Sequence, residues 1–187
     1  DAIAWQLDVP GVAGCGGLAL SPSGETLAMS CAGSFADGAG QDARAGVVVL
    51  DARGDVPVVL RRIDAAALGG PAGPSIAFAS ETELVGTAYG SESPKHPDVA
   101  FVLDVGSGVA TRAFSAARAF VLGDVRCTTG CTARCFVADA DRSGLARFAV
   151  TAGAAGPIDV VPVDVTRGLP PRYLGGFLRA TRRACAC

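Results

Sequence analysis

Three oxygen-bearing residues at alternate positions form the clearest candidate for metal chemistry in this chain. Asp139, Asp141 and Ser143 belong to the segment Asp-Ala-Asp-Arg-Ser-Gly at 139–144, which matches the start of an EF-hand-type calcium loop. Calcium prefers several hard oxygen ligands, and this spacing can bring three of them together. The twelfth position of the loop is Val150 instead of the usual bidentate Glu. Because Asp and Gly also form ordinary hairpin turns, a plain turn is the alternative, and we expect no other cofactor.

Cysteines supply a second kind of chemistry, and two of them should face each other across a hairpin. Pro22-Ser23-Gly24 fits a three-residue hairpin loop, with proline in a type I turn and glycine in the left-handed position. If Ser21 faces Glu25 across this loop, counting outward along both strands places Cys15 opposite Cys31. We therefore predict a disulfide between them, worth roughly 3 kcal/mol in the chain-entropy model. Two free cysteines in the core are the alternative.

A second group of cysteines, Cys127, Cys131 and Cys135, recurs at every fourth residue. Zinc sites usually begin with a closer pair of cysteines, and here a fourth ligand would have to come from Cys185 or Cys187. A disulfide fits better, because Cys127 and Cys135 flank the connection between two expected strands. Seven cysteines leave at least one free or paired outside the chain. Disulfides predict an extracytoplasmic location: the periplasm, the cell surface or the medium.

The residue pattern gives little support to catalysis. His96, the single histidine of the chain, is the only conventional base near neutral pH, and it lies in a proline-flanked loop. No Gly-x-Ser-x-Gly nucleophile elbow accompanies it, so a surface residue is the simpler interpretation. Acidic residues at the ends of expected strands can cap turns or line a channel; they are Asp51, Asp104, Asp124 and Asp164.

Composition excludes several classes of protein. Half of the 187 residues are hydrophobic and 18% are charged, which is enough apolar material for a core and argues against a disordered segment. The apolar runs have strand length, and none approaches the roughly 18 to 20 residues of a transmembrane helix. The net charge of -2, without a basic stripe, argues against a nucleic-acid partner. The chain begins at Asp1, so either a leader has been removed or the chain is a piece of a longer protein.

Short strand-like runs separated by turn residues predict an all-β fold. We expect three units of four antiparallel strands, at residues 15–63, 75–114 and 119–165. The third strand ends alike in the first two units, with Val-Val-Leu-Asp at 48–51 and Phe-Val-Leu-Asp at 101–104. Residues 2–9 resemble the outer strand of a preceding unit, and 166–187 form the start of a next unit or a tail. Four-stranded units of this length are typical of propeller blades.

The first unit resembles a known family. Leu18 to Leu27, Leu-Ala-Leu-Ser-Pro-Ser-Gly-Glu-Thr-Leu, is similar to the opening of a blade in YVTN-type and WD-repeat-like bacterial β-propellers. Val47 to Asp51 resembles the Val-x-Val-Ile-Asp strand that follows in that family. The likeness is clear in the first unit, present in outline in the second and weak in the third. It implies an all-β fold of antiparallel four-stranded blades, and it specifies fold more than function.

Propellers usually have about four to eight blades, so three units indicate an incomplete β-propeller-like repeat. An open wedge of three blades would leave two apolar faces uncovered. The expected partners are therefore the missing blades of the same protein or a self-associating copy.

Two classes of function fit these observations. The first is a non-catalytic, exported binding or scaffold module with an unknown protein or carbohydrate ligand. The second, which the family resemblance implies, is a fragment of a lactonase-like propeller hydrolase. That activity needs acidic, arginine and histidine residues converging on a central channel, and the single histidine favours the first class.

Overall fold

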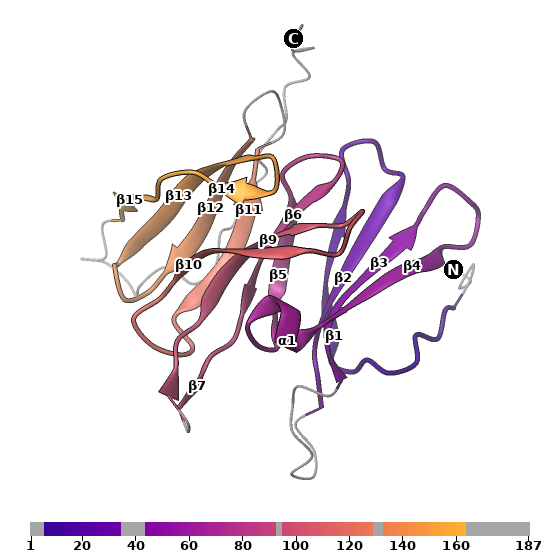
Figure 1. Cartoon of the computed structure of the whole chain (residues 1–187), viewed down its shortest axis with the longest axis horizontal. Coiled ribbons are helices and arrows are strands. Elements are labelled where there is room, and N and C mark those ends of the chain that lie inside the picture. The colour runs from indigo at the N-terminus through magenta and orange to yellow at the C-terminus, as the bar shows by residue number, and fades with distance from the viewer. Residues whose placement is uncertain (1–5, 35–43, 93–94, 129–132, 164–187) are drawn as a thin grey trace, which may run out of the picture.

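Three antiparallel sheets follow one another along the chain (Figure 1). The computed structural model describes residues 6–34, 44–92, 95–128 and 133–163. The first sheet has the order β1 (Cys15–Leu20), β2 (Thr26–Ala32), β3 (Ala45–Asp51) and β4 (Val58–Asp64). The second sheet contains β5 (Ala72–Phe78), β6 (Glu83–Ala88), β9 (Val99–Asp104) and β10 (Ala110–Ser115), again paired in chain order.

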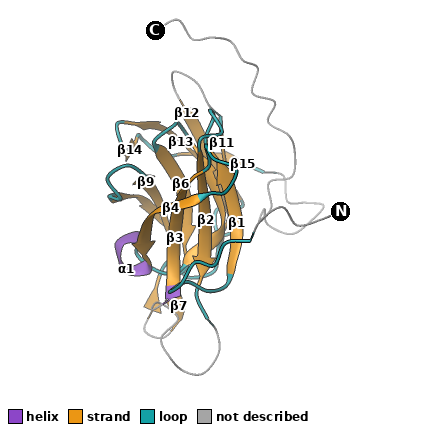
Figure 2. Ribbon diagram, turned by 90° about the vertical axis from the view of Figure 1, so that its right-hand side faces the viewer, coloured by secondary structure: helices purple, strands orange, loops and turns teal. Residues whose placement is uncertain are grey.

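The third sheet ends in a divided outer strand. It contains β11 (Leu122–Cys127), β12 (Ala133–Asp139) and β13 (Gly144–Thr151), followed by β14 (Ala154–Ala155) and β15 (Asp159–Pro162), which both pair with β13. The described residues also form a short helix, α1 (Ala65–Leu68), and a small hairpin of β7 (Ser91–Glu92) and β8 (Lys95–His96). Both α1 and β7 lie toward the same end of the sheets (Figures 1 and 2).

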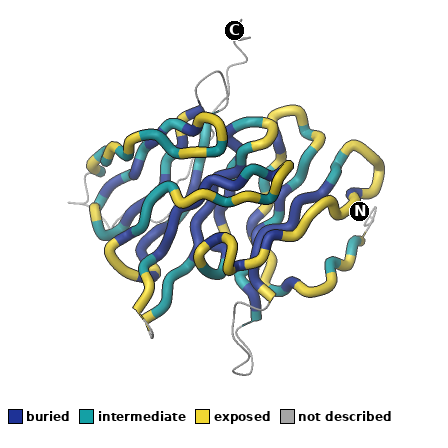
Figure 3. The backbone as a smooth tube through the Cα atoms, viewed as in Figure 1, coloured by how far each residue is buried: buried dark blue, intermediate teal, exposed yellow. Residues whose placement is uncertain are grey.

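The second sheet is buried on both faces. Leu84, Phe101 and Leu103 pack with Val47 and Val49 of the first sheet. The alternate side chains of the second sheet pack against the third sheet; this core includes Val85, Val102, Val137 and Phe148. Figure 3 shows the resulting concentration of buried backbone in the inner strands. Burial on both faces explains why β9 is a continuous apolar run instead of an alternating one.

The two outward faces of this stack differ. The outer face of the first sheet is apolar: Val12, from the segment that precedes β1, packs on Val48 and Leu50, while Leu18 of β1 stays 66% exposed. On the outer face of the third sheet, apolar residues alternate with arginines such as Arg147. Two uncovered apolar faces were expected, and that expectation is wrong for the described residues, because the third sheet carries charge on its free face.

The first strands of the three sheets lie side by side, since β5 contacts both β1 and β11. The backbones of β1 and β5 approach closely at Gly17, where a Cβ atom would lie only 2.2 Å from the carbonyl oxygen of Pro74. Glycine is therefore required here by the close approach of another strand. All-β architecture built from antiparallel four-stranded sheets agrees with the prediction and is compatible with an incomplete propeller-like repeat.

Some expected elements differ from the observed ones. The expected fourth strand of the third unit, 158–165, is shorter in the structure, where β15 covers Asp159–Pro162 and β14 lies before the expected range. Asp164 and Val165 lie outside the described residues. In the expected strand 2–9, residues 6–9 form no strand, and 2–5 lie outside the described residues. The segment 166–187, with Cys185 and Cys187, also lies outside them, as does Cys131.

The described residues contain two disulfides, and each joins the first two strands of a sheet. Cys15 pairs with Cys31 across β1 and β2, with Cα atoms 3.8 Å apart, and Cys127 pairs with Cys135 across β11 and β12, at 4.0 Å. Each pair is flanked by a backbone hydrogen bond; Ala32 N–H donates to Gly14, and Thr128 N–H donates to Arg134. The cysteines therefore occupy the closer, non-hydrogen-bonded type of cross-strand position.

The predicted hairpin register was wrong along most of β1. Ser21 bonds to Thr26, so the loop holds four residues instead of three, and Leu20 lies opposite Leu27. A one-residue bulge at Gly16 then shifts the register back and brings Cys15 opposite Cys31. The predicted cysteine pair is present because the bulge compensates for the longer loop.

Replacing Cys15 and Cys31 together by Ala should lower the free energy of unfolding by about 3 kcal/mol, because the unfolded chain regains the freedom of a closed loop. Urea denaturation under oxidising conditions measures this loss. In the presence of reductant, the double variant and the wild type should unfold at similar urea concentrations. Detection of free thiols at both positions of the oxidised wild type by mass spectrometry would contradict the pairing.

Candidate functional site

A buried carboxylate organises the loops at one end of the second and third sheets. Asp98 is completely buried, and its Oδ1 accepts hydrogen bonds from the backbone N–H groups of Gly90 (2.7 Å) and Phe120 (2.9 Å). Its Oδ2 accepts from Val121 (2.7 Å) and Leu122 (2.9 Å). Three successive backbone N–H groups converging on one anion form the concave arrangement called a nest. Asp98 thus fixes the turn before β11 against the loop that contains β7 and β8.

The turn held by Asp98 exposes an aromatic ring in an unusual backbone conformation. Phe120 has φ of 58°, and its side chain is 48% exposed. This left-handed region is unfavourable for a bulky residue. Its ring packs against Tyr89, with ring centres 5.9 Å apart. Phe120 is therefore an exposed aromatic held in a strained conformation by its neighbours.

An ion pair connects this turn to the turn that contains the calcium candidates. Arg118 donates to Asp141 Oδ1 at 2.7 Å. The hydrogen bond to Asp141 raises the pKa of Arg118, and the charge of Glu92 on β7 adds to this effect. The loops around β7, Phe120 and Asp141 thus form one connected polar surface around the exposed ring, which we call the loop surface.

The calcium candidates have other partners in this structure. Asp139 Oδ1 accepts the backbone N–H groups of Asp141 and Arg142, as in an ordinary turn, and Oδ2 lies 3.4 Å from the Arg142 guanidinium. Asp141 is paired with Arg118, and Ser143 has φ of 47°. Among the described residues, no three His, Cys, Asp or Glu side chains are grouped to hold a metal ion. Arg118 and Arg142 lie beside these carboxylates, which favours the turn, while Asp139 Oδ2 and Asp141 Oδ2 are buried and accept no hydrogen bond. A calorimetric titration at about 1 mM calcium distinguishes the turn from a calcium site.

The remaining acidic candidates cap turns or pair with arginines. Asp104, at the end of β9, accepts the backbone N–H of Ser107 at 2.6 Å, and this bond is the main reason that its pKa is lowered. Asp51, at the end of β3, pairs with Arg53, which lowers the pKa of Asp51 to about 2. Asp124 lies 3.8 Å from Arg126, and Asp164 is outside the described residues.

His96 lies in the exposed strand β8, opposite Ser91. The sequence predicted a proline-flanked surface loop here, and the short β7–β8 hairpin was not foreseen. The sequence analysis did not identify Asp98, because an acidic residue in a loop before an apolar strand is common. Its partners 90 and 120–122 are distant in the chain, so only the tertiary structure reveals them.

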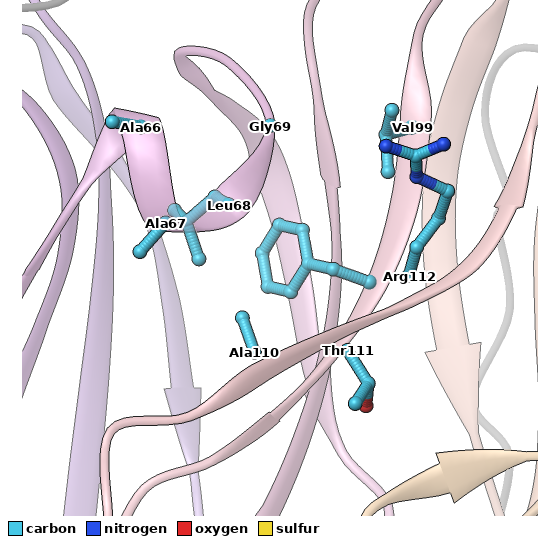
Figure 4. Close-up of a pocket in the computed structure, with 9 residues that line it drawn as sticks. Ala66, Ala67, Leu68, Gly69, Val99, Ala110, Thr111 and Arg112 are labelled. Atoms are coloured by element: carbon cyan, nitrogen blue, oxygen red, sulfur yellow. The ribbon is translucent and has the colours of Figure 1, made fainter.

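Two shallow pockets lie beside α1, between the outer strands β4 and β10. The one drawn in Figure 4, of about 190 Å³, has Ala67 and Gly69 on one side and Val99 and Arg112 on another. Its neighbour, of about 330 Å³, is lined by Arg61 and other residues of β4 and the β9–β10 turn. Ligand sites for drug-sized molecules usually enclose about 300 to 1,000 Å³, so the first pocket is too small for such a ligand and the second only reaches the lower end of this range.

No protein-family model matches the chain, and no curated protein matches it. The likeness of the first unit to YVTN-type and WD-repeat-like propellers therefore depends on the residues quoted above. No helix in the described part of the chain is long and apolar enough to cross a bilayer.

Asp98→Asn should lower the free energy of unfolding by about 2 to 4 kcal/mol. The amide oxygen of Asn can accept two of the four N–H groups, while its NH₂ group faces the other two donors. Urea denaturation measures the loss. Asp159→Asn, which removes an exposed ion pair with Arg147, is the matched control and should cost less than about 1 kcal/mol. Equal losses in the two variants would contradict the role of Asp98.

Asp51 should remain ionised well into the acid range. Its pKa of about 2 lies below the ordinary value of 3.8, so its pairing stabilises the fold above that ordinary value, and the contribution is lost as the pH falls through about 2. Carbon-13 NMR of the side-chain carboxyl groups measures the titration. Arg53→Ala should return the midpoint toward 3.8, and an unchanged midpoint in this variant would show that Arg53 is not the cause.

Proposed function

We propose that the chain is a binding or scaffold module of an exported, propeller-like protein, and that the loop surface contacts its ligand. The observation that carries this proposal is Phe120, an exposed aromatic held at positive φ on a rigid turn. Strained residues concentrate where proteins bind ligands, and binding loops are usually presented by a rigid scaffold. A sequence under selection for folding alone would place Gly or Asn at such a position.

The chemistry of the loop surface suits recognition by an aromatic anchor. Phe120 offers apolar area, Arg118 offers hydrogen-bond donors, and Asp141 and Glu92 offer acceptors close to Arg118. Exposed aromatic and arginine side chains dominate the energetics of many binding sites. An unknown protein or carbohydrate is the proposed ligand.

Two further features support the proposed setting. Disulfides persist mainly in oxidising compartments, so the bonds Cys15–Cys31 and Cys127–Cys135 support export to the periplasm, cell surface or medium. The four-stranded sheets and the Leu18–Leu27 motif support a YVTN-type or WD-repeat-like bacterial propeller. The alternative of a lactonase-like hydrolase gains no specific support, since His96 is exposed on β8, away from any acid cluster among the described residues.

Phe120→Gly separates binding from folding, because glycine removes the ring and also relieves the strained φ. We expect the free energy of unfolding to change by less than about 1 kcal/mol. Affinity for any ligand found by screening the wild type on an oligosaccharide array or a displayed peptide library should fall roughly tenfold or more.

Val109→Ser is the matched control for this experiment. Val109 is also an exposed apolar residue, but it lies in the β9–β10 turn at the opposite end of the second sheet. Its replacement should leave binding unchanged. If Phe120→Gly binds as well as the wild type, or if it unfolds the protein, the ring has a structural role and the proposal is wrong.

A further inference from the structure

The first and second sheets share one register, so their residues can be compared position by position. Asp51 at the end of β3 pairs with Thr26, and Asp104 at the end of β9 pairs with Glu83. Counted from these two pairs, one face of each sheet carries two apolar rows that run across its first three strands. The rows are Phe78, Leu84 and Leu103 beside Ile76, Gly86 and Phe101 in the second sheet, and Leu20, Leu27 and Leu50 beside Leu18, Met29 and Val48 in the first. The two faces are therefore counterparts.

These counterpart faces differ in burial. The face of the second sheet packs on the first sheet, and its Ile76 and Phe78 are each 5% exposed. At the same two positions of the first sheet, Leu18 and Leu20 are 66% and 56% exposed. The outer face of the first sheet thus has the composition of a covered face, but no sheet covers it among the described residues.

The covering side is alike at both junctions between sheets. The first sheet presents a row of small apolar residues toward the second sheet, and the second sheet presents a similar row toward the third. These rows are Ala19, Ala28 and Val49 in the first sheet and Ala77, Val85 and Val102 in the second. Sheets pack face to face about 10 Å apart, so small side chains on one face leave room for larger ones on the other. The sheet that fits the outer face of the first sheet is therefore one with a row of this kind.

The segment that leads into the first sheet lies where a connection between two sheets runs. In the second sheet this connection contains α1, whose Leu68 is buried in the same core as Phe101. In the first sheet, Val12 is buried with Val48, which is the counterpart of Phe101. Each segment thus adds one apolar side chain at the same place, and the second sheet shows that such a side chain leaves space for a covering sheet.

We propose that the outer face of the first sheet holds a further four-stranded sheet of the same repeat, connected to β1 through the segment that contains Val12. A row of alanine and valine then covers Leu18 and Leu20, as the first sheet covers Ile76 and Phe78. Stacked repeats bury a continuous apolar core in this way. This face is separate from the loop surface, so the proposal does not depend on the ligand proposed there.

A second copy of the chain fits this face less well. The small-residue faces of the first and second sheets are already covered within each molecule. The free face of the third sheet carries Arg134 and Arg147, and burying their charges against leucines would be costly. A polar free face is typical of the unit that ends a stack of repeats, so we expect the stack to continue only on the side of the first sheet.

Met29, in the same row as Leu18, is half-buried and is the single methionine of the chain, so its oxidation reports on this face. The full chain is compared with a variant in which residues 14–71 are duplicated, so that an added copy of the first sheet precedes the original. The added copy carries Met29→Leu, which leaves one methionine to follow. Oxidation by hydrogen peroxide, measured by peptide mass spectrometry, should be roughly tenfold or more slower in the duplicated chain, because the added sheet excludes the oxidant.

A charge in the covering row provides the matched control. Val49→Arg in the added copy should return the oxidation of Met29 to the wild-type rate, because the covering row then carries an unpaired charge. Circular dichroism shows whether each added sheet folds. The proposal is overturned if the duplicated chain is oxidised at the wild-type rate, if its added sheet does not fold, or if the protection survives Val49→Arg.

The competing occupant, a second copy, is tested by size-exclusion chromatography with light scattering on the wild type. We expect a monomer at micromolar concentrations. A dimer that Leu20→Lys breaks would assign the face to a second copy and overturn the proposal. Each of these measurements is independent of Phe120, so their failure is distinguishable from a failure of the proposed binding function.

Discussion

Four backbone N–H groups converge on the carboxylate of Asp98, and the junction of the second and third sheets depends on them. Buried N–H groups that lack a partner are costly, and three of these four belong to successive residues whose donors point the same way. A single acceptor atom cannot satisfy them, but the two oxygens of one carboxylate can. The backbone of Asp98 also bonds to Arg118 and Ala116, so this residue ties both sides of the connection together. By accepting the N–H of Phe120, Asp98 helps to hold this residue in its left-handed conformation, together with the packing of the ring on Tyr89.

The sequence predicted those features that depend on local patterns. Both β3 and β9 were placed correctly because a buried apolar run followed by Asp has few other interpretations. The turns after these strands also agree, since Asp51 and Asp104 accept hydrogen bonds from residues two or three positions later. An apolar run and the acidic residue that ends it lie within one short segment, so they can be recognised without knowledge of the tertiary structure.

Features that depend on distant residues were missed, and one prediction was correct only because two errors cancelled. In the hairpin of β1 and β2, the loop is one residue longer than predicted, and the bulge at Gly16, next to the close approach of β5 at Gly17, restores the cysteine pairing. The two adjacent glycines at 16 and 17 were the available signal, since glycine in a strand often marks a bulge or a close approach. Phe120 gave no signal, because aromatic residues favour strands and the left-handed turn is imposed by Asp98.

The positions of the two disulfides follow from how each sheet is buried. The second sheet lies between the other two and gains apolar burial on both faces, and its first strand, β5, is held between β1 and β11. The first and third sheets each have only one face in the shared cores, so their first strands gain less from packing. It is these two strands that are linked by a disulfide to the strand beside them, Cys15 to Cys31 and Cys127 to Cys135. A covalent link destabilises the unfolded chain whatever the area buried, so its contribution does not depend on the packing around it. The second sheet, residues 72–115, contains no cysteine, so its cohesion depends on apolar burial and hydrogen bonds alone.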